Sequence, residues 1–325
     1  MRKLIILVFF CVSGFAADHP GTEDFVLRAT TEFGLQETEV RELLAGAEYQ
    51  QSIVDAISRP AEGKPWHEYR KIFLTDSRIR QGIEFWNENR ELIATASDKF
   101  GVDEEVIVSI IGVETAYGRI TGGYRTVQAL VTQGFYYPQN LSSDRSEFFS
   151  NELLQYMQLA VEEGLPADKV KGSYAGAMGM GQFMPSSYRE YAVDLDADGK
   201  RDLWQSTPDV IGSVANYLHR HGWQANQPVV RRARASQGAS FDMIKRSLKP
   251  TLSVAEWQEK GFTSSSELSP ALPAAVMKLV EKDRNSYWLT FNNFYVITRY
   301  NRSPRYAMAV YELSQEIKKG MDVSG

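Results

Sequence analysis

The chain has 325 residues, of which 43% are hydrophobic, 24% charged and 12% aromatic. This length suggests two domains, or one large domain with additions, and the apolar content suffices for a substantial core, which argues against wholesale disorder. The 36 Lys and Arg residues against 41 Asp and Glu give a net charge of -5, which does not fit the basic surface of a nucleic-acid-binding protein.

The N-terminus has the pattern of a cleavable signal peptide. Two basic residues precede an apolar run at 4–12, which is too short to span a membrane. Small residues in the segment 14–16 predict cleavage after Ala16, which leaves a mature chain without cysteine and with a net charge of -7. Cys11 is the one candidate for lipid attachment, but Phe10 precedes it where a small residue is required. We therefore expect an exported soluble protein, with lipid anchoring as the less favoured alternative.

Hydrophobic residues recur at helical spacing along most of the chain. Two of the predicted helices carry end signals: Asp103 is suited to cap a helix, and Pro208 stands at a first helical position, where proline is favoured. The predicted helices cover residues 24–48, 80–99, 103–118, 148–163, 207–222 and 304–320.

The composition changes near the C-terminus. Residues 227–234 and 287–300 are rich in Val, Tyr, Phe, Thr and Trp, and loops containing Ser and Pro separate them. This composition predicts strands of a small β-rich insertion. The whole chain is therefore expected to be mainly α-helical with a β appendage.

Glu114 is the first residue with a pattern that suggests chemistry. It lies in the segment 111–118 (IGVETAYG), in the last turn of a mainly apolar helix. Burial and the negative end of the helix dipole both predict a raised pKa for its carboxyl group. A carboxylic acid that keeps its proton near neutral pH is what glycosidic bond cleavage requires as a general acid. The alternative is a structural glutamate paired with Arg119 or Arg125.

A glycine-rich segment, residues 172–188 (GSYAGAMGMGQFMPSSY), contains four glycines and two alanines in its first ten residues. These small residues let the backbone come close to a ligand or to another helix. No Gly-Lys-Ser/Thr follows, so the segment is not a phosphate-binding loop. One interpretation is the wall of a sugar-binding groove, with Ser173 and Gln182 as polar contacts and Tyr188 as an apolar platform. The other is tight helix packing.

Residues 194–202 (DLDADGKRD) have the spacing of the first half of an EF-hand-type calcium loop. Three alternate aspartates would repel one another without a cation. Position 12 is Gln205 in place of the usual bidentate glutamate, so a more distant carboxylate would have to close the site. The alternative is a solvated acidic turn. The expected ligands are Asp194, Asp196, Asp198, the carbonyl oxygen of Lys200, and Asp209.

Together these motifs resemble the lytic murein transglycosylase B family (glycoside hydrolase family 103), peptidoglycan-cleaving enzymes with a lysozyme-like core. The matching segments run in the family's order from about residue 80 to 320: IGVETAYG, GSYAGAMGMGQFMPSSY, YAVDLDADGKRDLW, IGSVANYLHRHGW and NNFYVITRYNRSPRYAMAVYEL. The resemblance implies a lysozyme-like core at 100–225 and a small β-rich domain at 226–303. It also implies an α domain at 17–99, completed by the C-terminal helix 304–325.

The resemblance implies a lytic transglycosylase that cleaves the MurNAc–GlcNAc β-1,4 bond and forms 1,6-anhydroMurNAc. Glu114 would act first as the acid and then as the base, with no cofactor for the chemistry and a structural Ca²⁺. One departure concerns residues 137–140, which read Tyr-Pro-Gln-Asn where the family usually has Tyr-Pro-Arg-Arg, and Arg145 is a candidate replacement. The implied substrate contacts are Ser173, Gln182, Tyr217, Tyr300, Asn301 and Tyr306.

Two alternatives remain at this point. A hydrolase needs a second carboxylate beside the cleaved bond, for which Asp144 and Glu147 are candidates. A calcium-stabilised wall-binding protein needs no catalytic acid. We expect a periplasmic monomer without a transmembrane segment that binds peptidoglycan glycan strands and no nucleic acid. Cell-wall synthesis proteins are further candidate partners.

Overall fold

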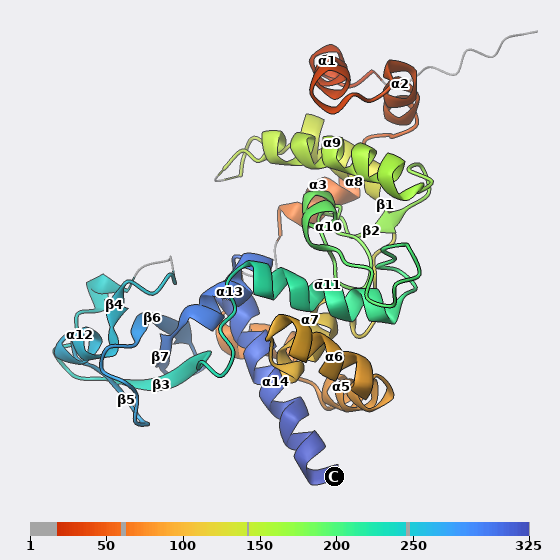
Figure 1. The fold of residues 1–325 in the computed structure, drawn as a ribbon. Helices are drawn as coiled ribbons and strands as arrows, with labels where there is room; N and C mark the ends of the chain where they lie inside the picture. Colours follow the sequence, from red (N-terminus) through yellow and green to blue (C-terminus); the bar gives the residue numbers. More distant parts are fainter. Residues whose placement is uncertain (1–17, 60–62, 142, 245–247, 325) are drawn as a thin grey trace, which may run out of the picture.

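The structure, a computed structural model, describes residues 18–59, 63–141, 143–244 and 248–324 (Figure 1). The expected signal peptide at 1–16, with Cys11, lies outside these residues. The described part is mainly helical, as the sequence predicted, with a five-stranded sheet on its side and a two-stranded sheet within the helical part. Within it, no helix combines the length and the apolar character that crossing a membrane requires.

The N-terminal part is made of short helices that pack against later ones. The helix predicted at 24–48 is two helices, because Gly34 takes the left-handed conformation (φ 65°) and ends the first. The helix predicted at 80–99 is likewise two, which meet at Asn89. The elements are α1 (Thr22–Phe33), α2 (Glu37–Ala45), α3 (Gln51–Ile57), α4 (Trp66–Tyr69), the 3-10 turn η2 (Arg70–Ile72), α5 (Asp76–Glu88) and α6 (Arg90–Phe100).

The central part contains helix α7, which is buried along almost its whole length where it packs against α5, α6, α11 and the C-terminal helix. Helices α8 and α9 pack side by side, α10 packs against α9, and α11 packs against α6, α7 and α10 (Figure 1). The helices predicted at 148–163 and 207–222 are confirmed, and each of their ends lies within two residues of the predicted position. The elements are α7 (Glu104–Thr115), β1 (Tyr124–Arg125), α8 (Thr126–Phe135), α9 (Ser146–Glu163), β2 (Lys171–Gly172), α10 (Pro185–Tyr191) and α11 (Thr207–Arg220).

The predicted β-rich region contains a five-stranded antiparallel sheet in the order β4-β6-β7-β3-β5. The sheet has its own hydrophobic cluster around Trp257 and Phe262. The elements are β3 (Val230–Ala235), the 3-10 turn η3 (Phe241–Met243), β4 (Leu252–Ser253), α12 (Val254–Glu259), β5 (Phe262–Ser264), β6 (Pro273–Val280) and β7 (Asn285–Thr290).

The strand prediction for 287–300 is wrong after residue 290, because the next segment is helix α13 (Asn292–Tyr300). Its β-prone residues include Phe294 and Ile297, which lie on one helical face and are buried where α13 packs against α11 and α14. Asn293 fixes the start of the helix by donating to the carbonyl oxygens of Gln224 and Gln227. Tertiary contacts therefore override the local β propensity.

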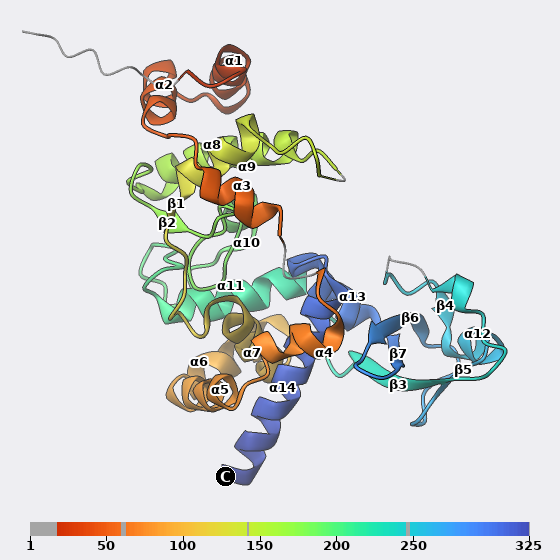
Figure 2. The same cartoon turned by 180° about the vertical axis from the view of Figure 1, so that it is seen from behind.

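The C-terminal helix α14 (Pro304–Ser324) packs against helices from the first half of the chain. It packs against α5 and α7, and Figure 2 shows its start beside α13. Its buried face includes Met308, Val310 and Leu313, which were expected from the sequence pattern. This packing brings the first turn of α14 next to the last turn of α7.

Candidate active site

Glu114 is the second-last residue of α7, and the chain leaves the helix through two left-handed residues, Ala116 (φ 52°) and Tyr117 (φ 60°). The Tyr117 ring folds back over α7, so a Cβ at Gly112 would meet its hydroxyl at 2.5 Å. Glycine is therefore required two residues before Glu114. This tight reversal ends the helix with the glutamate in its last turn, as the sequence predicted.

The end of α7 is tied to the glycine-rich segment. Thr115 Oγ1 donates to the carbonyl oxygen of Met180 at 2.8 Å and accepts the backbone N–H of Gly118 at 3.0 Å. The two motifs that the sequence singled out are therefore in contact around Glu114.

A buried tyrosine holds the Glu114 side chain. Tyr306, in the first turn of α14, is 2% exposed, and its hydroxyl donates to Glu114 Oε1 at 2.5 Å. Burial and the negative charge of Glu114 hold the pKa of Tyr306 well above its usual value. Tyr306 therefore stays protonated and keeps its donor at neutral pH.

Two further tyrosines continue this cluster. Tyr300 donates to the carbonyl oxygen of Gly181 at 2.6 Å, and its ring centre lies 4.7 Å from that of Tyr217. Burial, followed by the charge of Glu114, raises the pKa of Tyr300 well above the usual value. Burial also raises the pKa of Tyr217, whose ring stacks on His221 at 4.1 Å.

A groove of about 1110 Å³ begins at this aromatic cluster and runs between α9, α10 and α13. Tyr217, Tyr300 and Asn301 line it, as the resemblance implied. Four arginines line it against two glutamates, so the groove is suited to carboxylate-bearing ligands. The arginines are Arg145, Arg189, Arg299 and Arg302.

Glu114 and Tyr306 are not among the residues that line this groove, and the two other expected contacts also lie outside it. Ser173 Oγ accepts the backbone N–H of Ala177 at 3.1 Å, and Gln182 Nε2 donates to the carbonyl oxygens of Thr121 and Gly179. Both side chains are half-buried and shape the glycine-rich segment, although neither lines the groove.

The expectation for Tyr188 is wrong, because its side chain is fully buried and donates to the carbonyl oxygen of Arg201. It packs beside Trp204 and cannot serve as a platform in the groove. The glycines of the same segment serve tight packing. A Cβ at Gly179 (φ 68°) would lie 2.4 Å from the Leu203 carbonyl oxygen, and one at Gly176 would lie 2.5 Å from the side chain of Leu130.

The carboxylates considered for a hydrolase lie outside the groove. Asp144 and Glu147 are both exposed, and Asp144 accepts the backbone N–H of Ser146 at 2.8 Å. Arg145 between them does line the groove, with its guanidinium 4.6 Å from the centre of the Phe148 ring.

Sequence reasoning missed Glu152, a groove residue on α9 that is 5% exposed. Its two oxygens accept the Ser186 backbone N–H at 2.9 Å and hydroxyl at 2.6 Å. Burial raises the pKa of Glu152, although these two hydrogen bonds lower it. The available signal was one acidic residue on the otherwise apolar face of α9, between Phe149 and Leu153.

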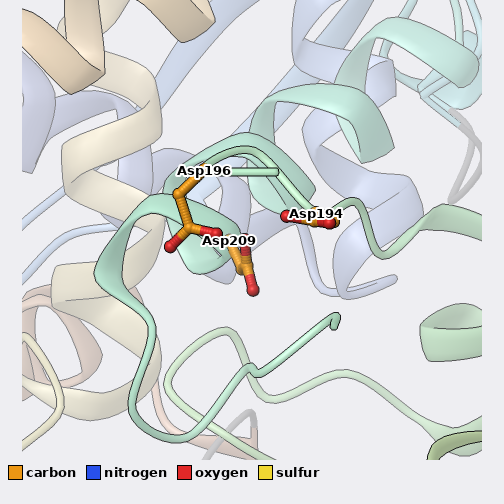
Figure 3. A group of neighbouring side chains, drawn as sticks. All are labelled: Asp194, Asp196 and Asp209. Carbon is orange, nitrogen blue, oxygen red and sulfur yellow. The ribbon is translucent and has the colours of Figure 1, made fainter. Parts of the chain in front are cut away.

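Two aspartates of the acidic loop lie next to Asp209 in the first turn of α11 (Figure 3). Carboxylate oxygens of Asp194, Asp196 and Asp209 all lie within 4.8 Å of one another. Asp198 is not in this group, because it is exposed and its Oδ1 accepts the backbone N–H of Lys200 at 2.9 Å. The structure thus brings together three of the four expected aspartate ligands.

The chemistry of this group fits a hard divalent cation. Asp209 is fully buried, and its oxygens accept the backbone N–H groups of Leu195 and Asp202. Burial raises the pKa of Asp209, the two backbone hydrogen bonds lower it, and the charge of Asp196 raises it again. The clustered negative charge is therefore unfavourable by itself, and a bound cation would relieve it.

Comparison with known proteins agrees with this architecture. A family model described as a transglycosylase SLT domain matches residues 18–315. The chain is 36% identical over 316 residues to the membrane-bound lytic murein transglycosylase B of Escherichia coli (strain K12). The matched region covers 94% of this chain and 85% of that protein.

Two solved structures are also similar over nearly the whole chain. The catenated lytic transglycosylase SltB1 of Pseudomonas aeruginosa has 44% identity and a TM-score of 0.86, with 94% of this chain and 99% of that chain covered. The Escherichia coli lytic transglycosylase Slt35 in complex with calcium has 36% identity and a TM-score of 0.83, with 95% and 96% covered.

Proposed function

The chain belongs to the family of transglycosylase SLT domains, and we propose that it cleaves the β-1,4 bond between MurNAc and GlcNAc and leaves a 1,6-anhydroMurNAc end. It is a peptidoglycan lytic transglycosylase with a lysozyme-like fold, as the motifs indicated. The observation that best supports the proposed mechanism is the fixed position of Glu114, whose carboxyl group Tyr306 holds next to the groove residue Tyr300.

Glu114 acts first as the general acid. Its proton passes to the glycosidic oxygen, the bond from that oxygen to C1 of MurNAc breaks, and the GlcNAc part leaves with a free hydroxyl group. The N-acetyl group of the same MurNAc stabilises the positive charge at C1, so no second protein carboxylate is required.

Glu114 then acts as the general base. The 6-hydroxyl of MurNAc attacks C1 and gives its proton to the Glu114 carboxylate, which closes the 1,6-anhydro ring and restores the acid. Tyr306 keeps the carboxyl group in place through both steps, and one residue serves as both acid and base.

The groove supplies the substrate contacts. Tyr217, Tyr300 and Asn301 line the groove, and the charge of Glu114 acts on Tyr217 and Tyr300. Arg145 supplies a cation on the side where the usual arginine pair is replaced. Ser173 and Gln182 support the groove through the glycine-rich segment. A hydrolase is less well supported, because Asp144 and Glu147 are exposed and both oxygens of the buried Glu152 accept hydrogen bonds from Ser186.

We further propose a structural calcium ion held by Asp194, Asp196 and Asp209, with Asp198 and the Lys200 carbonyl oxygen completing the site when it is loaded. The ion would neutralise these carboxylates and fasten the acidic loop to α11, and it takes no part in the chemistry. The relative Slt35 in complex with calcium supports this assignment.

For location, we propose export to the periplasm by the signal peptide 1–16, with anchoring through Cys11 as the alternative. The membrane-bound name of the Escherichia coli relative makes this alternative worth testing. Labelling of the expressed protein with a radioactive fatty acid, compared with a Cys11→Ser variant, distinguishes the two.

Product analysis tests the function. Purified sacculi are digested in H₂¹⁸O, and the released muropeptides are weighed. Transglycosylation predicts products one water lighter than those of hydrolysis and free of ¹⁸O. Incorporation of ¹⁸O at the new end would show a hydrolase, and no soluble product would show a binding protein.

A further inference from the structure

The small sheet carries a charge that is opposite to that of the rest of the protein. The segment 230–290 contains ten Lys and Arg residues against six Asp and Glu, whereas the whole chain has a net charge of -5. Positive charge is therefore concentrated in this segment of an otherwise acidic protein.

Two of these Lys and Arg residues project from one face of the sheet. Arg232 and Arg234 are two residues apart on β3 and therefore point to the same side, and both are exposed. Arg232 pairs with Trp288 on β7, and its guanidinium carbon lies 4.9 Å from the centre of the Trp288 ring. A cation and an aromatic ring thus form a single partly exposed surface.

A chain of hydrogen bonds connects this surface to a second cationic group. Trp288 Nε1 donates to Ser286 Oγ at 3.2 Å, and Ser286 Oγ donates to Glu281 at 2.9 Å. Glu281 lines a hollow of about 430 Å³ between η2 and the β6–β7 turn, together with the cations Lys71 and Lys282.

We call the two groups together the basic strip. It comprises His67, Lys71, Lys282, Trp288, Arg232 and Arg234, and the hydrogen bonds through Ser286 and the acidic Glu281 connect its two parts. Within the described ranges, no ion pair neutralises any of its four Lys and Arg side chains. The basic strip shares no residue with the groove next to Glu114. Its charges are therefore available to a partner while the groove is occupied.

We propose that the basic strip binds a glycan strand of peptidoglycan away from the cleavage site, an inference that rests on the proposed function. The lactyl groups and peptide stems of the strand carry carboxylates at intervals. Several separated cations can therefore each contact a carboxylate of one strand, whereas a small ligand with a single anion would reach only one of them. Trp288 adds an aromatic edge for the apolar faces of sugar rings.

A lipid surface fits this strip less well. Peripheral membrane binding needs a sizeable apolar face together with cations. The exposed aliphatic side chains near the strip are Ile72 and Val280, each only 41% exposed. The strip is mainly charged, which favours a hydrated anionic polymer.

Binding at a second place would keep the enzyme on the wall between cleavage events. Two sites on one polymer raise the local concentration of substrate at the groove. Because the contacts are exposed ion pairs, the additional affinity is expected to fall as salt rises.

The test measures how much protein sediments with intact sacculi over a range of salt concentrations. Every protein carries Glu114→Gln so that the sacculi are not digested. The test variant adds Arg232→Gln and Arg234→Gln. The matched control adds Lys278→Gln and Lys249→Gln, which remove the same charge from exposed positions of the β-rich region outside the strip.

We expect the apparent Kd of the test variant to rise about three- to tenfold at low salt, with a smaller salt dependence, and the control to stay within about twofold of the parent. Equal binding by test variant and control would overturn the proposal. Vesicles with anionic lipid are run in parallel, and strip-dependent binding to vesicles but not to sacculi would also overturn it. Product release from a short soluble peptidoglycan fragment by the wild-type enzyme tests the proposed function separately. The proposed cleavage and the proposed binding by the basic strip can therefore be contradicted independently.

Discussion

The hydroxyl of Tyr306 donates to Glu114 Oε1 at 2.5 Å, although the two residues are 192 positions apart in the chain. The contact exists because the first turn of α14 packs beside the end of α7. It fixes one carboxyl oxygen of Glu114 by a buried donor. The C-terminal helix is therefore part of the proposed catalytic arrangement.

Replacing Tyr306 by Phe removes this donor and keeps the ring. Hydrogen bonds to charged groups are worth about 1.5–3 kcal/mol, so kcat/KM should fall about 10- to 100-fold. Because the donor favours the carboxylate over the protonated acid, its loss should move the alkaline limb of the pH–rate profile to higher pH. Rates are measured on muropeptide release from pH 4 to 9.

Tyr311→Phe is the matched control, since Tyr311 lies on the same helix but lines the pocket around Arg231. A Tyr306→Phe variant with an unchanged pH profile, or a control with the same loss, would contradict a role for this hydrogen bond in catalysis.

Glu152→Gln separates the proposed mechanism from hydrolysis. Glutamine keeps an oxygen for Ser186, and burial already favours the uncharged form of Glu152. We expect a change in unfolding free energy within about 1 kcal/mol and kcat within about threefold of the wild type. Glu152→Ala should cost about 1–3 kcal/mol because the Ser186 N–H loses its acceptor. A loss of about 10² or more in kcat for a folded Glu152→Gln would make Glu152 a second catalytic carboxylate.

Calcium should change the effect of Asp196→Asn on thermal stability. In saturating calcium the wild type should melt at a higher temperature than the variant, because the ion binds only the folded site. In the presence of a chelator the variant should melt at the same temperature as the wild type or at a higher one, since the substitution removes the repulsion between Asp196 and Asp209. Asp198→Asn tests whether a fourth aspartate takes part. Melting curves that do not respond to calcium or chelator would remove the proposed site.

Gly179→Ala tests the packing of the glycine-rich segment. The new Cβ would lie 2.4 Å from the carbonyl oxygen of Leu203 in a left-handed residue, so we expect a loss of about 3 kcal/mol or more. Gly164→Ala is the control, because Gly164 is also left-handed (φ 62°) but has open space, and it should cost about 1 kcal/mol. The free energies of unfolding are measured in urea. Equal losses for the two variants would mean that the short distance between the new Cβ and the Leu203 carbonyl oxygen does not destabilise the fold.

The sequence best predicted the features that depend on neighbouring residues. The helix with Glu114 in its last turn, the helix at 148–163 and the closeness of Asp194 and Asp196 come from patterns within a few residues, and each is found in the structure, whereas Asp198 lies outside the aspartate cluster. Periodicity and end signals suffice for such features because their causes lie in neighbouring residues.

What it missed depends on contacts between distant segments. Helix α13 has β-prone residues that tertiary packing makes helical, and Tyr188 is covered by Trp204 and the chain at Arg201. Glu152 gains its place through Ser186, which lies 34 residues away. Tyr306 was expected near the substrate only through the family resemblance, and nothing in its local sequence indicates that it binds Glu114.

The central claim is that Glu114 alone supplies and recovers the proton. Glu114→Gln keeps the volume and the contact with Tyr306 but has no transferable proton, and a positioned acid–base group is worth roughly 10² to 10⁴ in rate. The measurement is the rate of anhydro-muropeptide release from sacculi by the wild type and by Glu114→Gln, with melting curves and sacculus binding alongside. We predict a folded variant that still binds sacculi and loses activity by about 10⁴ or more. A folded variant that keeps more than about a tenth of the wild-type rate would contradict the mechanism and leave Glu114 as a structural residue at the end of α7.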